Sequence, residues 1–411
     1  MASLLVVLVV LGCAAFQFLK GTVVRAFAAI IAAVCASIVA FGFFEVLAKL
    51  LAGYAPSLAP WAQLISFALL FILAFAVLQT AITQLTRHPV DLGYLPERIG
   101  RAFCGIVLGL FVSGVLLTAA AMAPLPNKYP YARFDARNPK PERPNKVLLN
   151  ADGFATGWFS TVSSGSFSAL RNKRSFAALH PGFLDQLYLN RHNISNGTSV
   201  VTSSLAIEVP KKAAWYAPDN ITDSDGNPLT SRSGHSLVIA RVGIKGSALK
   251  DAGKFTLSQL RLVCQPKNQA ADPLVGEGRN AYPVGYMKSA TQLQTKSLSD
   301  QITLQPGDFG SGERVKWIDF AFYVPNDQVC TLVQFKLNNV VQISPPVPAE
   351  QAPPAVAFSE RAARGGAGGR PAPSSRPARR PASQDGSRTR PRRGISDISR
   401  SVIGDQLDED Q

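Results

Sequence analysis

The first 123 residues alternate between long apolar segments and short polar connections. This pattern predicts four helices, at about residues 2–18, 23–47, 61–85 and 99–123. A helix rises about 1.5 Å per residue, so about 20 apolar residues cross the roughly 30 Å hydrocarbon layer of a bilayer. Residues 102–122 carry no ionisable side chain except Cys104. The chain therefore predicts a four-helix membrane domain over residues 1–123.

The pattern changes after the last apolar segment. Residues 124–150 are rich in proline and arginine and predict a linker that follows the surface. Residues 151–344 contain β-branched and aromatic runs separated by turn residues, which is typical of strands. The runs cover residues 199–209, 236–244, 255–264, 301–304, 315–324 and 331–343. They predict a soluble domain with the fold of a mostly antiparallel β-sandwich.

The last section, residues 345–411, contains mainly Pro, Ala, Gly, Ser and Arg. Such a composition buries too little apolar surface to offset the entropy of ordering the chain, so it predicts a disordered tail. The tail is rich in arginine over residues 361–393 and acidic at its end. It is interpreted either as a solvated segment or as a segment that binds an anionic surface such as phospholipid head groups.

The distribution of basic residues predicts the orientation in the membrane. The first and third connections and their margins carry Lys20, Arg25, Arg87, Arg98 and Arg101, whereas the second carries only Lys49. Positive residues are retained in the cytoplasm, so both termini are predicted outside it. Basic residues over 128–143 argue against this orientation. The net charge of +15 favours nucleic acid as a partner only if the topology is inverted.

Small and charged residues in or near the helices are the candidates for function. Gly105 and Gly109 lie four residues apart, so they share one helix face and allow a neighbouring helix to approach closely. Arg98 and Arg101 lie near the same face. One interpretation is helix packing and anchoring at the head groups; the other is a polar cluster that gates a path through the bundle. The candidate packing or gating residues are Lys20, Gly21, Arg25, Glu45, Arg98, Arg101, Gly105 and Gly109.

Two short motifs carry a resemblance to a known family. Lys20-Gly21 is followed by Arg25, and Glu97-Arg98 leads into the two glycines of the fourth helix. In these features residues 1–123 resemble the membrane domain of the colicin V production protein (CvpA) family. Ala26 and Glu97 differ from the acidic residue and the aspartate that are common there. The resemblance implies toxin production or export, envelope maintenance, and the cytoplasmic (inner) membrane of a bacterium. It implies no catalytic residue and no cofactor.

The sequence contains few patterns that are typical of catalytic or metal-binding sites. The four histidines have no metal-ligand spacing to one another or to a cysteine, and no phosphate-binding loop occurs. The glycine-rich segment 307–312 resembles the surroundings of a serine nucleophile, although Phe309 stands at the nucleophile position. It is interpreted either as a glycine-rich turn or as a hydrolase site in which Ser311 acts with His235 as base. Cys264 and Cys330 lie in the predicted soluble domain, where both a disulfide and two free thiols fit the sequence.

Three hypotheses for function follow. The leading one is a colicin V production type of membrane protein whose extracytoplasmic β domain binds without catalysis. The second is a small transporter or channel subunit that uses Arg25, Glu45, Arg98 and Arg101, and the third is an envelope hydrolase. The expected partners are the lipid bilayer, further copies of this chain or other envelope proteins, and an anionic surface for the tail.

Overall fold

The computed structural model describes residues 1–86, 93–164, 175–192, 206–229, 232–249, 253–269, 272, 274–309 and 314–360. All of these residues belong to one compact unit, Met1–Arg361. The greater part of the predicted tail, residues 361–411, lies outside the described residues.

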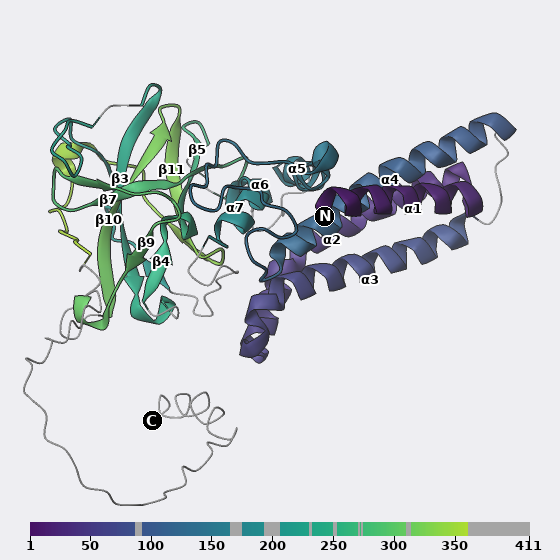
Figure 1. The fold of residues 1–411 in the computed structure, drawn as a ribbon, viewed down its shortest axis with the longest axis horizontal. Coiled ribbons are helices and arrows are strands. Elements are labelled where there is room, and N and C mark those ends of the chain that lie inside the picture. Colours follow the sequence, from purple (N-terminus) through teal and green to yellow (C-terminus); the bar gives the residue numbers. More distant parts are fainter. Residues whose placement is uncertain are drawn as a thin grey trace, which may run out of the picture. The chain divides into compact units, whose positions relative to one another are not determined.

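Four long helices form the N-terminal part: α1 (Ala2–Lys20), α2 (Val23–Tyr54), α3 (Ala62–Leu85) and α4 (Tyr94–Met122) (Figure 1). Each is long and apolar enough to cross a bilayer, which indicates a membrane protein. The four predicted apolar helices are therefore present. Three of them are longer than predicted: α1 continues to Lys20, α2 continues to Tyr54, and α4 begins at Tyr94. The short 3₁₀ helix η1 (Pro56–Trp61) follows α2.

The helices pack as antiparallel neighbours, α1 against α4 and α2 against α3. Glycines set the first contact. A Cβ atom built on Gly105 would lie 2.6 Å from the Cα of Ala14, and one on Gly109 would lie 2.6 Å from the Cα of Val10. The backbones can come this close only because both positions lack a side chain. Gly105 and Gly109 thus pack α4 directly against α1.

Three shorter helices follow the membrane helices: α5 (Ala151–Ser164), after the 3₁₀ turn η2 (Leu148–Asn150), then α6 (Phe176–Leu179) and α7 (Phe183–Leu189). They contact α4 and the β strands (Figure 1). The preceding segment is not the surface linker that its composition predicts, because Arg133, Phe134 and Val147 are buried. Its arginine and aromatic side chains have partners in these helices, and proline and arginine content alone does not reveal them.

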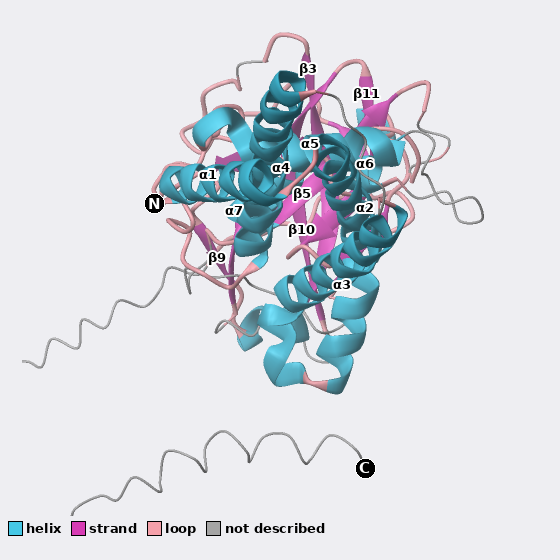
Figure 2. Ribbon diagram, turned by 90° about the vertical axis from the view of Figure 1, so that its right-hand side faces the viewer, coloured by secondary structure: helices cyan, strands magenta, loops and turns pink. Residues whose placement is uncertain are grey.

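The C-terminal part consists of antiparallel sheets, drawn as magenta strands in Figure 2. The largest sheet has the order β1-β3-β10-β7-β8, with β2 also paired to β3; the second has the order β12-β11-β5-β6, and β4 pairs with β9. The bounds are β1 (Ile207–Glu208), β2 (Ala214–Tyr216), β3 (His235–Lys245), β4 (Lys254–Thr256), β5 (Leu260–Pro266), β6 (Arg279–Ala281), β7 (Pro283–Met287), β8 (Leu293–Thr295), β9 (Gln301–Thr303), β10 (Val315–Pro325), β11 (Gln328–Phe335) and β12 (Asn339–Gln342).

One hydrophobic core contains side chains from both larger sheets, among them Val242 and Phe320 from one and Leu262 and Phe335 from the other. The antiparallel sheets are present as predicted, whereas the sandwich arrangement stays a prediction. The predicted strand 255–264 is divided into β4 and β5 by the 3₁₀ turn η4 (Leu257–Gln259), which Thr256 and Gln259 cap reciprocally.

The composition predicts disorder from residue 345, but the segment up to residue 360 has a defined place on the sheet. Val347 pairs with β2, and the backbone N–H of Val356 donates a hydrogen bond of 3.1 Å to Asp319. Phe358 is 3% exposed and lies in the main core, against Tyr286. Arg241 also donates to the carbonyl of Pro354, and Lys296 forms an ion pair with Glu360, so side chains and backbone together hold residues 345–360 on the sheet.

Candidate functional site at the helix and sheet junction

Aromatic side chains join α2 to the shorter helices. Phe41 stacks on Phe159 of α5 with ring centroids 4.8 Å apart, and it also meets Phe176 of α6. Phe44, one turn further along α2, meets Phe183 of α7. Aromatic contacts of this kind add to the stability that their buried area already provides. The membrane helices and the helices next to the sheets therefore share one core.

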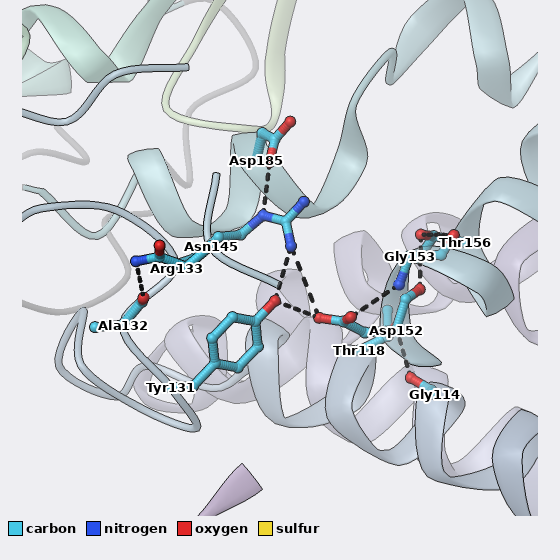
Figure 3. Close-up of polar contacts among 10 residues, drawn as sticks. All are labelled: Gly114, Thr118, Tyr131, Ala132, Arg133, Asn145, Asp152, Gly153, Thr156 and Asp185. Atoms are coloured by element: carbon cyan, nitrogen blue, oxygen red, sulfur yellow. Dashed lines mark hydrogen bonds and ion pairs between the residues drawn. The ribbon is translucent and has the colours of Figure 1, made fainter. Parts of the chain in front are cut away.

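A buried ion-paired cluster lies beside this core (Figure 3). Arg133 donates from Nε to Asp185 at 2.6 Å and from Nη1 to the hydroxyl of Tyr131 at 2.7 Å. That hydroxyl donates to Asp152 of α5 at 2.6 Å, and Arg133 lies 3.9 Å from the same carboxylate. The side chains of Arg133 and Asp152 are 8% and 1% exposed. One guanidinium thus holds together the segment after α4, α5 and α7.

Burial has opposite effects on two groups near the junction. It raises the pKa of the Asp185 carboxyl, and the Arg133 guanidinium only partly offsets this rise. It lowers the pKa of His192, although the backbone of Ala136 and the Asp135 carboxylate act in the other direction. The charged forms of both side chains are therefore disfavoured by the fold.

The lowered pKa of His192 predicts a loss of stability in acid. The unfolded chain binds a proton at the ordinary pKa of 6.5, whereas the folded chain binds it only at lower pH. The contribution of His192 is present above pH 6.5 and is lost as the pH falls through the folded value. We expect the free energy of unfolding in detergent micelles to fall below that pH, and to fall less in His192→Gln. An equal acid dependence in the variant would contradict this assignment.

A second buried arginine, Arg191, binds the carbonyl groups at the C-terminal end of α4. Arg191 is fully buried and donates from Nη2 to the backbone carbonyls of Ala120, at 3.1 Å, and Ala121. Its other amino group donates to the carbonyl of Tyr129, and the ring of Tyr188 lies 5.1 Å from its centre. The last carbonyls of a helix have no partners within it and carry partial negative charge, which a cation stabilises. Burial lowers the pKa of Arg191 to about 10, so it stays charged at neutral pH.

A chain of polar contacts leads from α2 into the second sheet. Glu45 lies 2.6 Å from Nε2 of His180, whose Nδ1 lies 3.2 Å from the amide oxygen of Gln186. Gln186 donates to the amide oxygen of Gln334 on β11, which also accepts from Nε of the buried Arg261 on β5. Polar side chains therefore connect a membrane helix, without interruption, to β5 and β11, which lie more than 200 residues later in the chain.

The contact between Glu45 and His180 predicts energetic coupling. Because the Glu45 side chain is 37% exposed, we expect a coupling free energy of about 0.5–1 kcal/mol in a double-mutant cycle of Glu45→Ala and His180→Ala. Unfolding in detergent micelles would measure it. The matched cycle of Lys49→Ala with His180→Ala should be additive, and equal coupling in the two cycles would contradict a specific pair.

The basic candidates from the sequence lie at the other end of the helices. Arg25 donates to the hydroxyl and the carbonyl of Thr86, at 3.1 and 3.0 Å. The Glu97 carboxylate accepts from Arg101 and from the backbone N–H of Val23, the first residue of α2. These contacts join the start of α2 to the end of α3 and the start of α4.

The remaining candidates have local contacts. Arg98 stacks on the ring of Tyr94, 4.3 Å from its centroid, and lies over Phe18. Gly21 ends α1, and Lys20 is exposed in its last turn. Glu45 and Arg25 are 20 residues apart on one helix, which is about 30 Å. The structure therefore does not bring Glu45 together with the three arginines of the transporter hypothesis.

The two soluble cysteines are direct neighbours. Cys264 on β5 lies opposite Cys330 on β11, and their sulfur atoms are 3.7 Å apart. Both are buried free thiols in this structure. In the hydrolase hypothesis, Ser311 lies outside the described residues, and the Nδ1 atom of His235 lies 2.9 Å from the carbonyl of Ser233. The described part of the chain contains no group of three side chains suited to a metal ion.

The β domain contains a cavity of about 300 Å³. Lys267 and Tyr216 line it, together with the ends of β3 and β10. Gln328, also in its wall, is 4% exposed, and its amide oxygen has no hydrogen-bond partner in the described structure. A cation and a buried acceptor suit a small polar ligand better than an apolar one.

Sequence reasoning missed the arginines of the junction. Arg133, Arg191 and Arg261 are buried, whereas isolated arginines are usually exposed and carry no periodic signal. No protein-family model, curated protein or solved structure matches this chain. The resemblance to the colicin V production family therefore depends on the motifs of the first 123 residues alone.

Proposed function

We propose that this chain is a bacterial inner-membrane protein of the colicin V production type, which serves toxin production or export, or envelope maintenance. In this proposal the β domain binds its partner without catalysis. The observation that carries it is the junction, where buried arginines, stacked phenylalanines and the polar contacts from Glu45 to Gln334 connect α2 and α4 to the β domain. A domain held in this way can present a binding surface at a constant distance from the bilayer.

The binding role has its best support in the β-domain cavity. Lys267 and the unpartnered amide oxygen of Gln328 can hold a small polar group. A matched pair of variants tests this role in cells. Lys267→Glu should abolish the protein's contribution to toxin export or envelope maintenance, whereas Lys288→Glu, outside the cavity, should not. Equal activity of both variants would argue against the cavity as the binding site.

The orientation proposed is with both termini and the β domain outside the cytoplasm. Lys20, Arg25, Arg98 and Arg101 gather at the end of the bundle away from the β domain, and positive residues favour the cytoplasmic side. Alkaline phosphatase, which needs an extracytoplasmic location for activity, should be active when fused after Glu360. A fusion that is inactive there, together with a cytoplasmic reporter that is active at the same position, would overturn the orientation.

The process served is tested by deletion. In a bacterium that carries this gene and secretes a peptide toxin, deletion should lower the toxin in the medium or make the envelope more permeable, and the full chain should restore both. Unchanged secretion and unchanged permeability would contradict the proposal. The transporter alternative predicts solute flux in reconstituted vesicles that Arg98→Ala abolishes.

A further inference from the structure

Helix α5 presents an aromatic stripe on its exposed side. Its exposed positions are Phe154, Gly157, Trp158 and Thr161, with the spacing i, i+3, i+4 and i+7 that defines one helix face. Phe154 is 48% exposed and Trp158 is 44% exposed. The opposite face, which includes Ala151, Ala155 and Phe159, is buried. Two large aromatic side chains therefore project away from the protein core.

This stripe lies beside the apolar part of α4 rather than beyond its end. The Ala151 carbonyl and the Cβ of Ala155 are packed onto Gly114. The ring of Phe154 meets that of Phe111, edge to face, with centroids 6.4 Å apart. Because α4 continues to Met122, Phe111 is about 16 Å from the end of that helix.

The packing of helix α1 indicates how deep in the bilayer the contact between Phe154 and Phe111 lies. Val10 faces Gly109 and Ala14 faces Gly105. The two helices are antiparallel, so each step toward the start of α1 corresponds to one step toward the end of α4. The same alignment brings the start of α1 beside Leu117, and Ala2, Leu117 and Ala151 share one apolar cluster. Helix α1 has 19 residues and is therefore about 28 Å long, close to the thickness of the hydrocarbon layer, so Ala2 lies near one edge of the bilayer when Lys20 lies near the other. Phe111 lies six residues before Leu117 along α4, which is about 9 Å inside that edge.

We infer that the stripe Phe154, Gly157, Trp158 and Thr161 is a lipid-contact surface, inserted among the acyl chains just below the head groups of the leaflet next to the β domain. A depth of about 5–10 Å is where the apolar face of an interfacial helix lies, and tryptophan is enriched at the adjoining membrane–water interface. The stripe adjoins α4, which is a membrane helix, so the lipid that surrounds α4 also covers the stripe. Helix α5 is then part of the membrane domain, and it sets the height of the junction in the bilayer. The inference does not depend on the proposed function.

Fluorescence quenching by lipids tests this inference. The full chain keeps Trp158 while Trp61, Trp215 and Trp317 are changed to Phe, and it is reconstituted into phosphatidylcholine vesicles with brominated acyl chains. We expect bromine placed high in the chains to reduce Trp158 emission at least about two-fold, and more than bromine placed near the bilayer centre. The matched control keeps only Trp215, which is 4% exposed in the β domain and should not be quenched. Full emission from Trp158 in brominated vesicles would overturn the inference, whether aqueous iodide quenches it or a second copy of the chain shields it.

Spin labelling gives a second measurement that keeps all four tryptophans. A Cβ atom on Gly157 would meet no heavy atom within 4 Å, so Gly157→Cys in a cysteine-free background should fold with a label attached. Oxygen should relax this label more strongly than a water-soluble nickel complex does. Gly12→Cys on α1 provides the lipid-facing control, and Asp225→Cys in an exposed turn provides the aqueous control. A label at residue 157 that behaves like the one at residue 225 would overturn the inference.

Discussion

Replacement of Arg133 by methionine is expected to destabilise the protein by about 3–5 kcal/mol, because it leaves the buried Asp152 carboxylate and the partly buried Asp185 carboxylate without their cation. The Asp152 side chain is 1% exposed and would keep only the Tyr131 hydroxyl and a backbone N–H as partners. Asp185 would lose its contact of 2.6 Å. Unfolding of the purified protein in detergent micelles, followed by tryptophan fluorescence, would measure the loss.

Two further variants make this expectation specific. Arg137→Met alters an exposed arginine of the same segment and should change the free energy of unfolding by less than about 0.5 kcal/mol. Adding Asp152→Asn to Arg133→Met removes one uncompensated charge, so the double variant should be more stable than Arg133→Met alone. The role given to the cluster is wrong if Arg133→Met costs no more than Arg137→Met.

Replacement of Gly114 by alanine is expected to cost about 3 kcal/mol. The added methyl group would overlap the backbone carbonyl of Ala151 and come within 2.9 Å of the Cβ of Ala155. A backbone atom cannot rotate away, so α5 as a whole would have to move from α4, and overpacking of this kind is destabilising. The expected result is a lower midpoint of thermal unfolding and a weaker contact between Phe111 and Phe154.

A glycine of the facing helix supplies the control. Gly157 is on the exposed side of α5, where an added Cβ has open space. Gly157→Ala should stabilise the helix by about 0.5–1 kcal/mol, because alanine loses less backbone entropy than glycine. If Gly114→Ala and Gly157→Ala unfold at the same temperature, the close approach of α4 and α5 does not make alanine at position 114 destabilising.

The membrane helices were predictable because their signal is local. Long apolar runs and the glycine spacing of α4 follow directly from the chain, and the long strands β3 and β10 follow from continuous runs of β-branched and aromatic residues. Short strands such as β6 and β8 have three residues each, too few for a pattern to emerge. Their place is fixed by neighbours in the sheet, not by their own composition.

The junction could not be predicted for a related reason. Arg133 and Asp185 are 52 residues apart, and Arg261 and Gln334 are 73 apart, so their partnership depends on the tertiary fold. Of the candidates that the sequence did provide, Glu45 reaches the junction, whereas Arg25, Arg98 and Arg101 have partners near the opposite helix ends. Charge in an apolar helix indicates that a partner exists, but not which residue it is.

The position of Arg191 has a consequence for how the protein is made. The carbonyl of Ala121 receives its hydrogen bond from a residue that the ribosome adds 70 positions later. When α4 enters the bilayer, its final turn still lacks that donor, and water or head groups must solvate it. Biogenesis therefore has an order. Helix α4 inserts first, and the segment that bears Arg191 must then emerge on the side of the membrane where α4 ends. Only after that can Arg191 shield the end of α4 from solvent.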